Sequence, residues 1–357
     1  MYFAILGTFT EICLEELQLI EPKNLVIKQG VAFFDSYSWS IEKLSGIIKR
    51  GEVATEDALY KYFTNTVLLW SNSEVFAKFI KSSGRVRRWK HLKDIRSSDL
   101  ELKKAWGVEL LEIDGKYCVV LGYQDIEHYE QIDFGKASSG MEIGMMPSKL
   151  AQMMVNIGMV ESNKKQVTSN QQPTTDNWQP ATIYDPFCWF GTTGFVVNWL
   201  GHHFIGSDIN ITPCKENVKR RKNWIWQRFD RFFTVFKHDV LEPFDSKKML
   251  DNVDVIVSEW WLGPVIKNFH QREIRKPDIM KKVSDVYIGF LRNYAQRFQE
   301  KKVPIVITIP VYQIDGSSIE QDLIVFCKEL GLHFRSIEQI YVRKGQNVGR
   351  KICIIWN

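Results

Sequence analysis

Residues Ala181–Asn210 read ATIYDPFCWFGTTGFVVNWLGHHFIGSDIN, and their order of apolar and small residues predicts a strand–loop–helix–strand unit. A short apolar run ends at Asp185, a glycine-containing loop follows, a helix is predicted over Phe195–Leu200, and a second apolar run ends at Asp208. Such a unit places a helix N-terminus beside the carboxyl ends of two parallel strands, where open α/β sheets bind ligands. Because Asp208 follows the first strand by about 20 residues, it is suited to bind ribose hydroxyls. The stretch therefore predicts a site for a nucleoside-containing cofactor.

The bulk composition indicates a soluble multidomain protein. With 357 residues, the chain is too long for one typical core, so two or three domains are expected. No apolar run approaches the roughly 20 residues needed to span a bilayer, and the N-terminus lacks a basic leader, so we expect a cytoplasmic protein without a membrane segment. The six cysteines form no C-x-x-C pair, which indicates reduced thiols and no structural metal site.

Two mixed α/β regions come first. Residues 1–56 are predicted to follow the β-α-β-β-α-β order of the ferredoxin-like plan, with a short helix around Trp39–Leu44. Residues 57–130 are predicted to contain a hairpin around Asp114-Gly115, and they carry a basic cluster that includes an aromatic residue, Trp89. Its basic members are Lys78, Lys81, Arg85, Arg87, Arg88, Lys90, Lys93 and Arg96. Positive charge beside an aromatic side chain suits phosphate contact and base stacking, and the alternative is a solvated charged face.

The rest of the chain predicts a connecting segment and a second type of sheet. Residues 131–180 are expected to hold an amphipathic helix over Met146–Ile157 and a polar linker over Glu161–Pro180. In residues 181–357, helices alternate with strands that are apolar throughout, which is typical of a doubly wound, mostly parallel sheet covered on both faces. The last two strands are expected to be an antiparallel addition at its edge. The predicted fold class is α/β.

Several segments carry a resemblance to a known family. They are FAILGTFTEICLEEL (Phe3–Leu17), QDIEHYEQIDFG (Gln124–Gly135), GMMPSKLAQMMVNIG (Gly144–Gly158), DPFCWFGTTG (Asp185–Gly194) and YVRKGQNVGRKI (Tyr341–Ile352). With them, nearly the whole chain resembles the THUMP-containing tRNA guanosine N2-methyltransferases. The resemblance implies a ferredoxin-like domain, a THUMP-like RNA-binding domain and a Rossmann-like class I methyltransferase domain. It also implies S-adenosylmethionine as the cofactor and tRNA or another structured RNA as the partner, and it leaves open whether a small activator subunit is needed, as in eukaryotic relatives; we expect a monomer otherwise.

The resemblance assigns cofactor contacts to individual residues. In the family, the loop here formed by Cys188–Thr192 surrounds the methionine part of the cofactor, the acid at Asp208 binds the ribose, and that at Asp239 binds the adenine amine. The helix that carries Lys149 backs the same pocket. The implied cofactor-binding residues are Lys149, Asp185, Phe187, Cys188, Gly191, Thr192, Asp208, Ile209, Asp239 and Val240.

The implied catalytic residues follow the fourth strand of the second sheet. They are Glu259, Trp260, Trp261 and Leu262, which align with the family's Asp or Asn, Pro, Pro and aromatic residue. The family's acid or amide accepts the hydrogens of an exocyclic amine and turns the lone pair toward the methyl group. Glu259 can accept the same hydrogens but reaches one methylene further, and either tryptophan could stack an extruded base. Packing of both tryptophans beside a surface acid is the alternative.

The sequence thus predicts an S-adenosylmethionine-dependent RNA methyltransferase that acts on guanosine N2 of tRNA. Two alternatives stay open. One is a non-catalytic RNA-binding or scaffold protein with a degenerate methyltransferase fold, because Trp189 stands where the family has glycine and the catalytic tetrapeptide is altered. The other is an amino-methyltransferase acting on DNA or another base, because the same chemistry serves adenine and cytosine amines. No metal is expected in any of the three.

Overall fold

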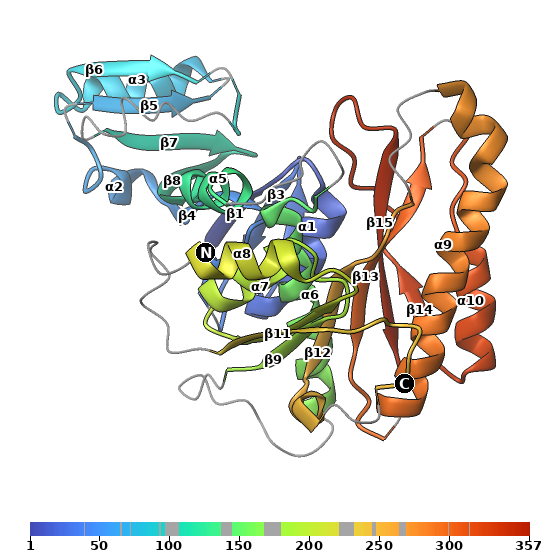
Figure 1. Cartoon of the computed structure of the whole chain (residues 1–357). Coiled ribbons are helices and arrows are strands. Elements are labelled where there is room, and N and C mark those ends of the chain that lie inside the picture. Colours follow the sequence, from blue (N-terminus) through green and yellow to red (C-terminus); the bar gives the residue numbers. More distant parts are fainter. Residues whose placement is uncertain are drawn as a thin grey trace. The chain divides into compact units, whose positions relative to one another are not determined.

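A computed structural model of the chain (Figure 1) describes residues 1–38, 40–64, 66–71, 73–92, 94–96, 107–136, 145–167, 180–220, 232–244, 248–263, 269–298, 300–313 and 315–357. These residues divide into two compact units, Met1–Asp125 and Ile126–Asn357. Each unit is built around its own β-sheet. None of the helices in the described ranges is both long and apolar enough to cross a membrane.

The first unit contains an eight-stranded sheet in the order β2-β3-β1-β4-β8-β7-β5-β6. The strands are β1 (Tyr2–Leu6), β2 (Val26–Lys28), β3 (Val31–Phe34), β4 (Ile47–Ala54), β5 (Thr66–Trp70), β6 (Arg88–His91), β7 (Val108–Ile113) and β8 (Lys116–Tyr123). The helices are α1 (Thr10–Leu17), η1 (Gln18–Ile20), η2 (Ile41–Lys43), α2 (Glu56–Leu59) and α3 (Glu74–Ser82). Neighbouring strands are antiparallel except for β5, which runs parallel to β6 and β7.

Two local predictions for this unit have different outcomes. The predicted hairpin around Asp114 is confirmed: Asp114 and Gly115 both have positive φ, at 51° and 70°, as a two-residue type I′ turn requires. The predicted helix around Trp39–Leu44 is wrong, because only a 3-10 turn forms at Ile41–Lys43, between extended residues on either side. Trp39 itself lies outside the described residues.

A buried ion pair connects the two halves of the first sheet. The Nζ atom of Lys49 on β4 lies 2.5 Å from Glu109 Oε1 on β7, and both side chains are fully buried. Tyr123 on β8 donates to the other carboxylate oxygen at 2.7 Å, and Lys49 also donates to the carbonyl of Ile95 at 2.7 Å. Because β4 pairs with β8, strands from the predicted regions 1–56 and 57–130 form one continuous sheet.

The second unit contains a seven-stranded sheet in the order β11-β10-β9-β12-β13-β15-β14. Its strands are β9 (Thr182–Asp185), β10 (His203–Asp208), β11 (Phe233–Lys237), β12 (Val255–Glu259), β13 (Ile305–Tyr312), β14 (His333–Ser336) and β15 (Val348–Trp356). Its helices are α5 (Ile126–Phe134), α6 (Ser148–Val167), α7 (Thr192–Trp199), α8 (Thr212–Arg220), η6 (Lys248–Asn252), α9 (Phe269–Phe298) and α10 (Glu320–Glu329).

The strand order of this unit confirms the predicted doubly wound, Rossmann-like sheet. Strands β11, β10, β9, β12 and β13 are parallel, and the chain order reverses direction between β9 and β12. Only β15 runs against its neighbours, pairing antiparallel with both β13 and β14. The reversal creates a switch point, and the crevice outside the carboxyl ends of the strands at that point is where such sheets bind ligands.

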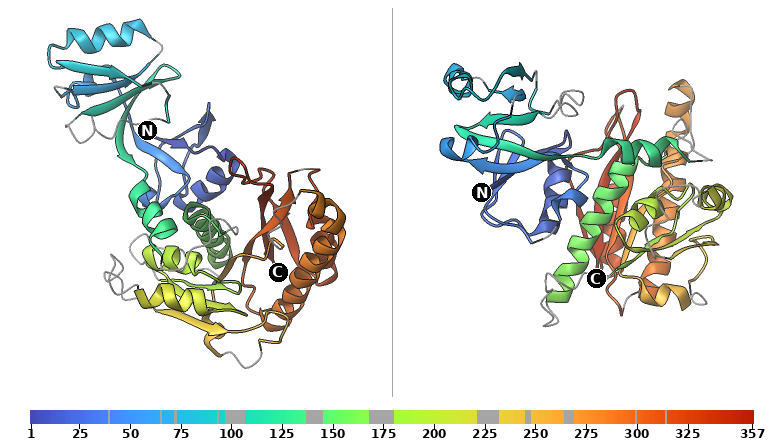
Figure 2. Two further views of the ribbon diagram at one scale, coloured as in Figure 1. Left: turned by 45° about the horizontal axis from the view of Figure 1, so that its top comes forward. Right: turned by 90° about the vertical axis from the view of Figure 1, so that its left-hand side faces the viewer.

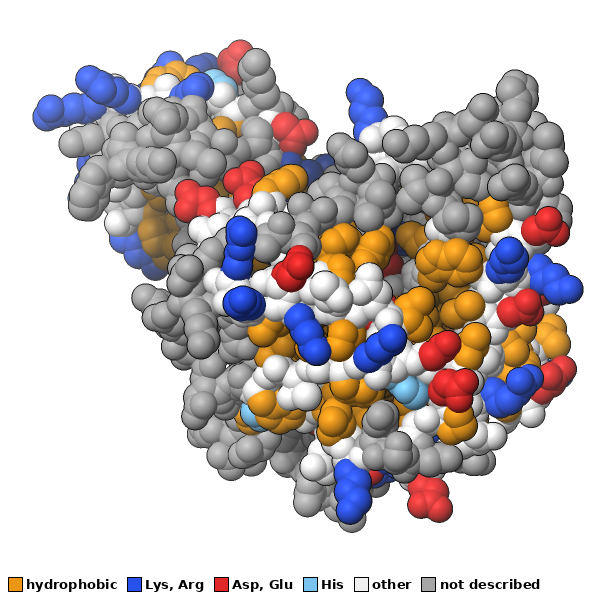
Figure 3. Space-filling model, viewed as in Figure 1, with side chains coloured by type: hydrophobic (Ala, Val, Ile, Leu, Met, Phe, Trp, Pro, Cys, Tyr) orange, Lys and Arg blue, Asp and Glu red, His pale blue; other side chains and the backbone are white. Residues whose placement is uncertain are grey.

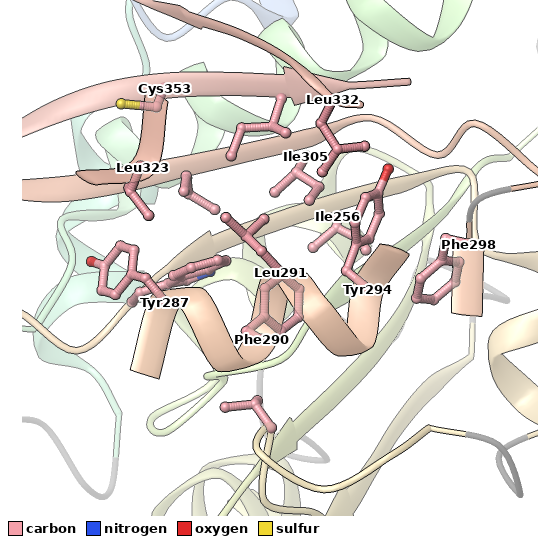
Figure 4. Close-up of a cluster of buried hydrophobic side chains, with 14 of the residues drawn as sticks. Ile256, Tyr287, Phe290, Leu291, Tyr294, Phe298, Ile305, Leu323, Leu332 and Cys353 are labelled. Atoms are coloured by element: carbon pink, nitrogen blue, oxygen red, sulfur yellow. The ribbon is translucent and has the colours of Figure 1, made fainter. Parts of the chain in front are cut away.

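Helices cover both faces of the second sheet. On one face, apolar side chains of α9, α10 and the strands form a common core (Figure 4), which includes Tyr287, Phe290, Leu291, Tyr294, Phe298, Ile256, Ile305 and Leu323. On the other face, α6 lies against β12 and β13 (Figure 2). The approach of α6 is so close that a Cβ atom at Gly158 would come within 2.6 Å of Val255 Cγ1.

Helix α6 is longer than predicted. The polar linker expected over Glu161–Pro180 is wrong in its first part, because α6 continues to Val167. Glu161 Oε1 accepts hydrogen bonds from Lys164 Nζ at 2.8 Å and from Arg335 Nη2 at 2.9 Å, and these contacts keep the polar turn helical. The predicted linker residues 168–179 lie outside the described residues.

Candidate cofactor and catalytic site

Asp185 ends β9 and holds the turn that follows it. Its side chain is buried, and Oδ1 accepts hydrogen bonds from the backbone N–H of Phe187 at 3.0 Å and from Ser258 Oγ at 2.5 Å. Burial raises the pKa of Asp185 to about 7, against the opposing effect of hydrogen bonds from Ser258, Thr193 and Phe187 N–H. Asp185 at the end of β9 is therefore linked to β12 by a buried hydrogen bond from Ser258.

The loop after Asp185 is fixed by contacts from β10 and α8. The Cys188 N–H donates to the carbonyl of Ser207 at 2.9 Å, and Asn217 Nδ2 donates to the carbonyl of Phe190 at 2.9 Å. Gly191 has a φ of +77° and caps α7, and a Cβ atom there would lie 2.8 Å from Cys214 Sγ. Only glycine meets both demands without strain. The loop is thus held in one path up to the N-terminus of α7.

Trp189 occupies the position where the resembled family has glycine. Its φ is +25°, so the backbone keeps a left-handed conformation that side chains disfavour. The indole is 36% exposed and stacks on Phe190, with ring centroids 4.4 Å apart. Trp189 therefore has a positive φ of the kind that glycine adopts readily, and its indole is partly exposed at the surface.

Asp208 ends β10 and reaches the Trp189 backbone. Its Oδ2 atom accepts a hydrogen bond from Trp189 N–H at 3.1 Å, and Oδ1 accepts one from Asn210 N–H at 2.9 Å. Burial raises the pKa of Asp208, while the N–H groups of Asn210, Trp189 and Ile209 act in the opposite direction. One carboxylate thus connects the loops that follow β9 and β10. Its predicted contact with a ribose stays a prediction.

The end of β11 lies beside the same acid. The backbone N–H of His238 donates to the carbonyl of Asp208 at 3.1 Å. The next residue, Asp239, accepts a hydrogen bond from Leu241 N–H through Oδ1 at 3.0 Å, which orders the turn, and Val240 is buried. The structure therefore brings the predicted residues after β9, β10 and β11 to one edge of the sheet.

Four large apolar side chains are exposed at this edge, one from the loop after each strand. They are Trp189 after β9 (36% exposed), Ile209 after β10 (64%), Leu241 after β11 (50%) and Trp261 after β12 (40%). We call these four residues the apolar rim. Figure 3 shows hydrophobic side chains gathered between α8 and α9 on this unit. An exposed apolar group beside carboxylates suits a ligand with a flat apolar ring and polar substituents.

Two lysines are candidates for this edge, one predicted from the sequence and one not. Lys149, expected to back the pocket, has its Nζ atom 5.3 Å from the centre of the Tyr129 ring. Lys136, which was not among the predicted residues, donates to Thr192 Oγ1 at 2.6 Å and reaches Met145 Sδ at 3.2 Å. Burial lowers the pKa of Lys136 to about 8. The one signal in the sequence was its position directly after the QDIEHYEQIDFG segment.

Glu259 ends β12 and forms an ion pair with Arg350 on β15. Both side chains are nearly buried, and Arg350 donates from Nε to Glu259 Oε1. Burial raises the pKa of Glu259, opposed by the positive charges of Arg350 and Arg343. Arg350 Nη1 also donates to Gln346 Oε1 at 3.3 Å, so the segment before β15 is tied to the same pair. The sequence did not predict this role for Arg350, since its partner is distant along the chain.

The two tryptophans after Glu259 have different environments. Trp260 is 1% exposed and packs against Phe187, Tyr287 and Phe290, with ring centroids 5.4, 4.3 and 4.5 Å away. The expectation that Trp260 could stack a base is therefore wrong, because its faces are covered by core residues. Trp261 is exposed, and Leu262 beside it is partly exposed. Only Trp261 of the pair can meet a ligand.

The predicted basic cluster occupies α3 and β6 of the first unit. Six exposed members are Lys78, Lys81, Arg85, Arg87, Arg88 and Lys90, and Figure 3 shows Lys and Arg side chains over these elements. Lys81 Nζ lies 4.4 Å above the Trp89 ring, which is itself 36% exposed. Strand alternation directs Arg88 and Lys90 to the opposite side from Trp89.

Two predicted members of the basic cluster differ from the rest. Arg96 turns away from the surface group: its Nε atom donates to the carbonyl of Leu6 at 3.1 Å, and its Nη2 atom lies beside Gly30. It therefore contributes to the fold of the first unit. Lys93 lies outside the described residues. All six cysteines are buried free thiols, and no group of three or more potential metal ligands occurs within the described ranges.

Comparison with known proteins identifies no family for this chain, so the fold assignment depends on the strand order. No protein-family model matches the chain, and no curated protein sequence matches it. Among solved structures, it is similar to magnesium protoporphyrin IX methyltransferase from Synechocystis with bound S-adenosylhomocysteine, at 10% identity over 65% of this chain and 93% of that one (TM-score 0.36). It is also similar to a human methyltransferase 10 domain containing protein, at 11% identity over 64% and 93% (TM-score 0.35). A third is the ribosomal protein L11 methylase of Lactobacillus delbrueckii, at 13% identity over 56% and 78% (TM-score 0.32).

The strand order defines a Rossmann-like unit, and the edge described above lies at its switch point, where such sheets bind ligands. The TM-scores are below 0.5, so the solved structures add nothing to that statement. What this edge could bind follows from its own residues.

Proposed function

We propose that the second unit binds S-adenosylmethionine and transfers its methyl group to the exocyclic amine of a nucleobase. One observation supports this above others. The ends of β9, β10, β11 and β12 and the loops that follow them bring the carboxylates of Asp208 and Asp239, the glycine-capped helix α7 and the apolar rim to the switch point of one sheet. A nucleoside needs both an apolar surface for its base and acceptors for its hydroxyls. The strand ends of the second unit supply both.

The residues of this edge fit the parts of such a cofactor. Asp208 is suited to the ribose hydroxyls, because its two oxygens accept hydrogen bonds from the Trp189 and Asn210 backbone and each has a further lone pair. Ile209 and Leu241 are exposed apolar side chains in the loops after β10 and β11, where an adenine ring could lie. The cofactor, when bound, supplies a methyl group activated by a sulfonium.

Glu259 is the proposed acceptor for the amine hydrogens. An exocyclic amine is a poor nucleophile because its lone pair is delocalised into the ring. Glu259 would hold these hydrogens so that the lone pair points at the methyl carbon, and the charge of Arg350 favours the ionised form of the carboxylate against the effect of burial. The bound cofactor would supply the methyl carbon and keep its sulfur as the neutral thioether, and the Glu259 carboxylate would take the proton that the methylated amine releases. Trp261, which is exposed, would stack the base.

The first unit is proposed to hold RNA. Its exposed basic side chains and half-exposed Trp89 suit phosphate contact and stacking. Together with the family resemblance in the sequence, this favours guanosine N2 of tRNA as the target. The division into a ferredoxin-like region (1–56), a THUMP-like region (57–130), a connector (131–180) and a catalytic region (181–357) stays a prediction, as do an activator subunit, a monomeric state and a cytoplasmic location.

A second candidate is a non-catalytic RNA-binding protein with the same fold. The observation in its favour is that Arg350 already engages one oxygen of Glu259. The two candidates differ in a direct assay. Purified protein is incubated with tritiated S-adenosylmethionine and unmodified tRNA, with single-stranded DNA in a parallel reaction, and the nucleosides are analysed by mass spectrometry.

Label in N2-methylguanosine is the result expected from the proposed function. Binding of RNA and cofactor without transfer supports the non-catalytic candidate. Label in DNA, and none in tRNA, contradicts the proposed substrate. A Glu259→Gln variant serves as the matched control, because the isosteric amide accepts hydrogen bonds through one oxygen only.

A further inference from the structure

The ammonium group of Lys136 lies at the start of α7. It follows α5 directly, and its Nζ atom donates to Oγ1 of Thr192, the first residue of α7, at 2.6 Å. The side chain is partly buried, and the Sδ atom of Met145 lies 3.2 Å from Nζ. The negative charge of Asp133 acts on Lys136, and among the described residues no carboxylate lies within ion-pair distance of its Nζ atom. A partly buried cation thus faces the loop of the proposed cofactor site.

This position is unfavourable for a positive charge unless an anion is added. The first N–H groups of a helix have no partner within the helix and give its N-terminus a partial positive charge. Asp133, the nearby acid, accepts a hydrogen bond from Ser148 N–H at 2.9 Å and faces Arg343 at 4.0 Å, so its charge is shared with other groups. Two positive features therefore converge on the Gly191–Thr192 turn.

A ligand group with one negative charge, bound beside this turn, would neutralise both the Lys136 ammonium group and the N-terminus of α7. S-adenosylmethionine has one such group, the carboxylate of its methionine part, while its sulfonium and amine are positive. A helix N-terminus and a lysine together make a site suited to a carboxylate, because charge-assisted hydrogen bonds are about twice as strong as neutral ones. The adenosine end has no comparable charge.

We propose that Lys136 binds the carboxylate of the cofactor and makes the site selective for ligands that carry one. This inference rests on the proposed function and adds a specificity-determining residue to it. Lys328, an exposed lysine on α10 with no assigned role in any site, is the control.

The test compares three ligands and four proteins by isothermal titration calorimetry. The ligands are S-adenosylhomocysteine, its decarboxylated analogue, which keeps the amine, and 5′-methylthioadenosine, which lacks both groups. The proteins are the wild-type full chain, Lys136→Met, Lys136→Arg and Lys328→Met. Thermal melts of each variant verify that it is folded.

We expect Lys136→Met to weaken S-adenosylhomocysteine binding by about 10- to 100-fold, as the loss of a charged hydrogen bond does. Binding of the decarboxylated analogue and of methylthioadenosine should change less than about threefold, since neither has the carboxylate. Lys136→Arg should retain most of the affinity, and Lys328→Met should match the wild type.

Two results would overturn the inference while leaving the proposed function intact. One is an equal loss of affinity for all three ligands in Lys136→Met, which assigns the lysine a merely structural role in the loop. The other is unchanged binding of S-adenosylhomocysteine. If the wild-type protein binds none of the three ligands, the proposed function itself is wrong, and the inference falls with it.

Discussion

Arg350 on β15 binds the carboxylate of Glu259 at the carboxyl end of β12, and both side chains are almost completely buried. The pair connects the proposed catalytic acid to the antiparallel strand that completes the sheet. A buried carboxylate without a cation would be protonated or would destabilise the fold, because removing a charge from water is costly. Arg350 is therefore a positioning residue for Glu259.

Removing the cation from this pair should strongly destabilise the second unit. We expect Arg350→Met to lower the free energy of unfolding by about 3–5 kcal/mol, because it leaves the Glu259 charge buried and unpaired. The double variant Arg350→Met/Glu259→Gln should recover part of the loss. Urea unfolding followed by tryptophan fluorescence measures both. A loss below about 1 kcal/mol in the single variant would show that the pair is not needed.

Glu259→Gln should separate chemistry from cofactor binding. The carboxylate acts only on the amine hydrogens, so we expect a fall in the methyl-transfer rate of about a hundredfold, with the affinity for S-adenosylmethionine within about threefold of wild type. Burial raises the pKa of Glu259, so the wild-type rate should fall as the pH drops through that raised value, while the variant shows no such fall. Single-turnover assays across pH provide the comparison; identical pH profiles would exclude the assigned role.

Trp189 allows a test of backbone strain in the loop. Its φ of +25° disfavours any residue with a Cβ atom. Trp189→Gly and Trp189→Ala both remove the stack on Phe190, but only glycine relieves the strain. We therefore expect the glycine variant to be more stable than the alanine variant by about 1 kcal/mol. Thermal denaturation of the pair gives the difference, and an alanine variant of equal or greater stability would contradict the positive φ.

Asp185 should make the stability of the protein depend on pH in a defined direction. Burial raises its pKa from 3.8 to about 7 in the folded state. Between these values the folded state binds more protons at this group than the unfolded state, so the contribution of Asp185 makes stability fall as the pH rises. The slope is at most about 1.4 kcal/mol per pH unit. Well above the raised pKa this contribution no longer changes.

The matched variant is Asp185→Asn, which keeps the shape and cannot ionise. Its free energy of unfolding, measured by urea titration across the interval between the two pKa values, should fall less steeply than that of the wild type. All other groups are common to both proteins and cancel in the difference. Parallel curves would mean that Asp185 is ionised throughout in the folded state.

The exposed face of β6 should bind phosphate groups. We expect Arg88→Ala/Lys90→Ala to weaken tRNA binding and to reduce the slope of log K against log salt by about 1 for each phosphate that is no longer neutralised. Exposed Lys23, elsewhere in the same unit, provides a control variant of similar exposure. Filter binding at several salt concentrations measures the slopes. An unchanged slope would assign the cluster to a solvated surface.

Much of the second unit was predictable because its strands are apolar throughout and its turns carry local signals. Asp185 and Asp208 were predicted to leave adjacent strands, and the pairing of β9 with β10 places them so. Arg350 and Lys136 were not predictable in this way. Each acts on a residue 91 or 56 positions away, and only the folded sheet decides which charges meet.

Local sequence signals also failed to predict features that tertiary contacts determine, namely the burial of two tryptophans and the end of α6. Trp260 and Trp261 are identical in type and adjacent in sequence, yet one is in the core and the other is exposed. The end of α6 depends on Arg335, which binds Glu161 from a distant strand. Helix propensity in a short stretch of sequence carries no information on either contact. The helix predicted over Met146–Ile157 therefore ended too early.

The loop between β9 and α7 must leave room for a sulfonium cofactor despite Trp189 if the second unit is a methyltransferase. Asp208 is the most direct probe of this loop, because its carboxylate binds both Trp189 N–H and Asn210 N–H. Asp208→Ala should therefore abolish cofactor binding while tRNA affinity is unchanged. Loss of both affinities, or of neither, would contradict this separation.

Equilibrium dialysis of the full-length protein against radiolabelled S-adenosylmethionine tests the proposed cofactor site most directly. We predict saturable binding to one site per chain in the wild type and none in Asp208→Ala. Absence of saturable binding in the wild type, with the protein shown to be folded, would contradict the proposed function.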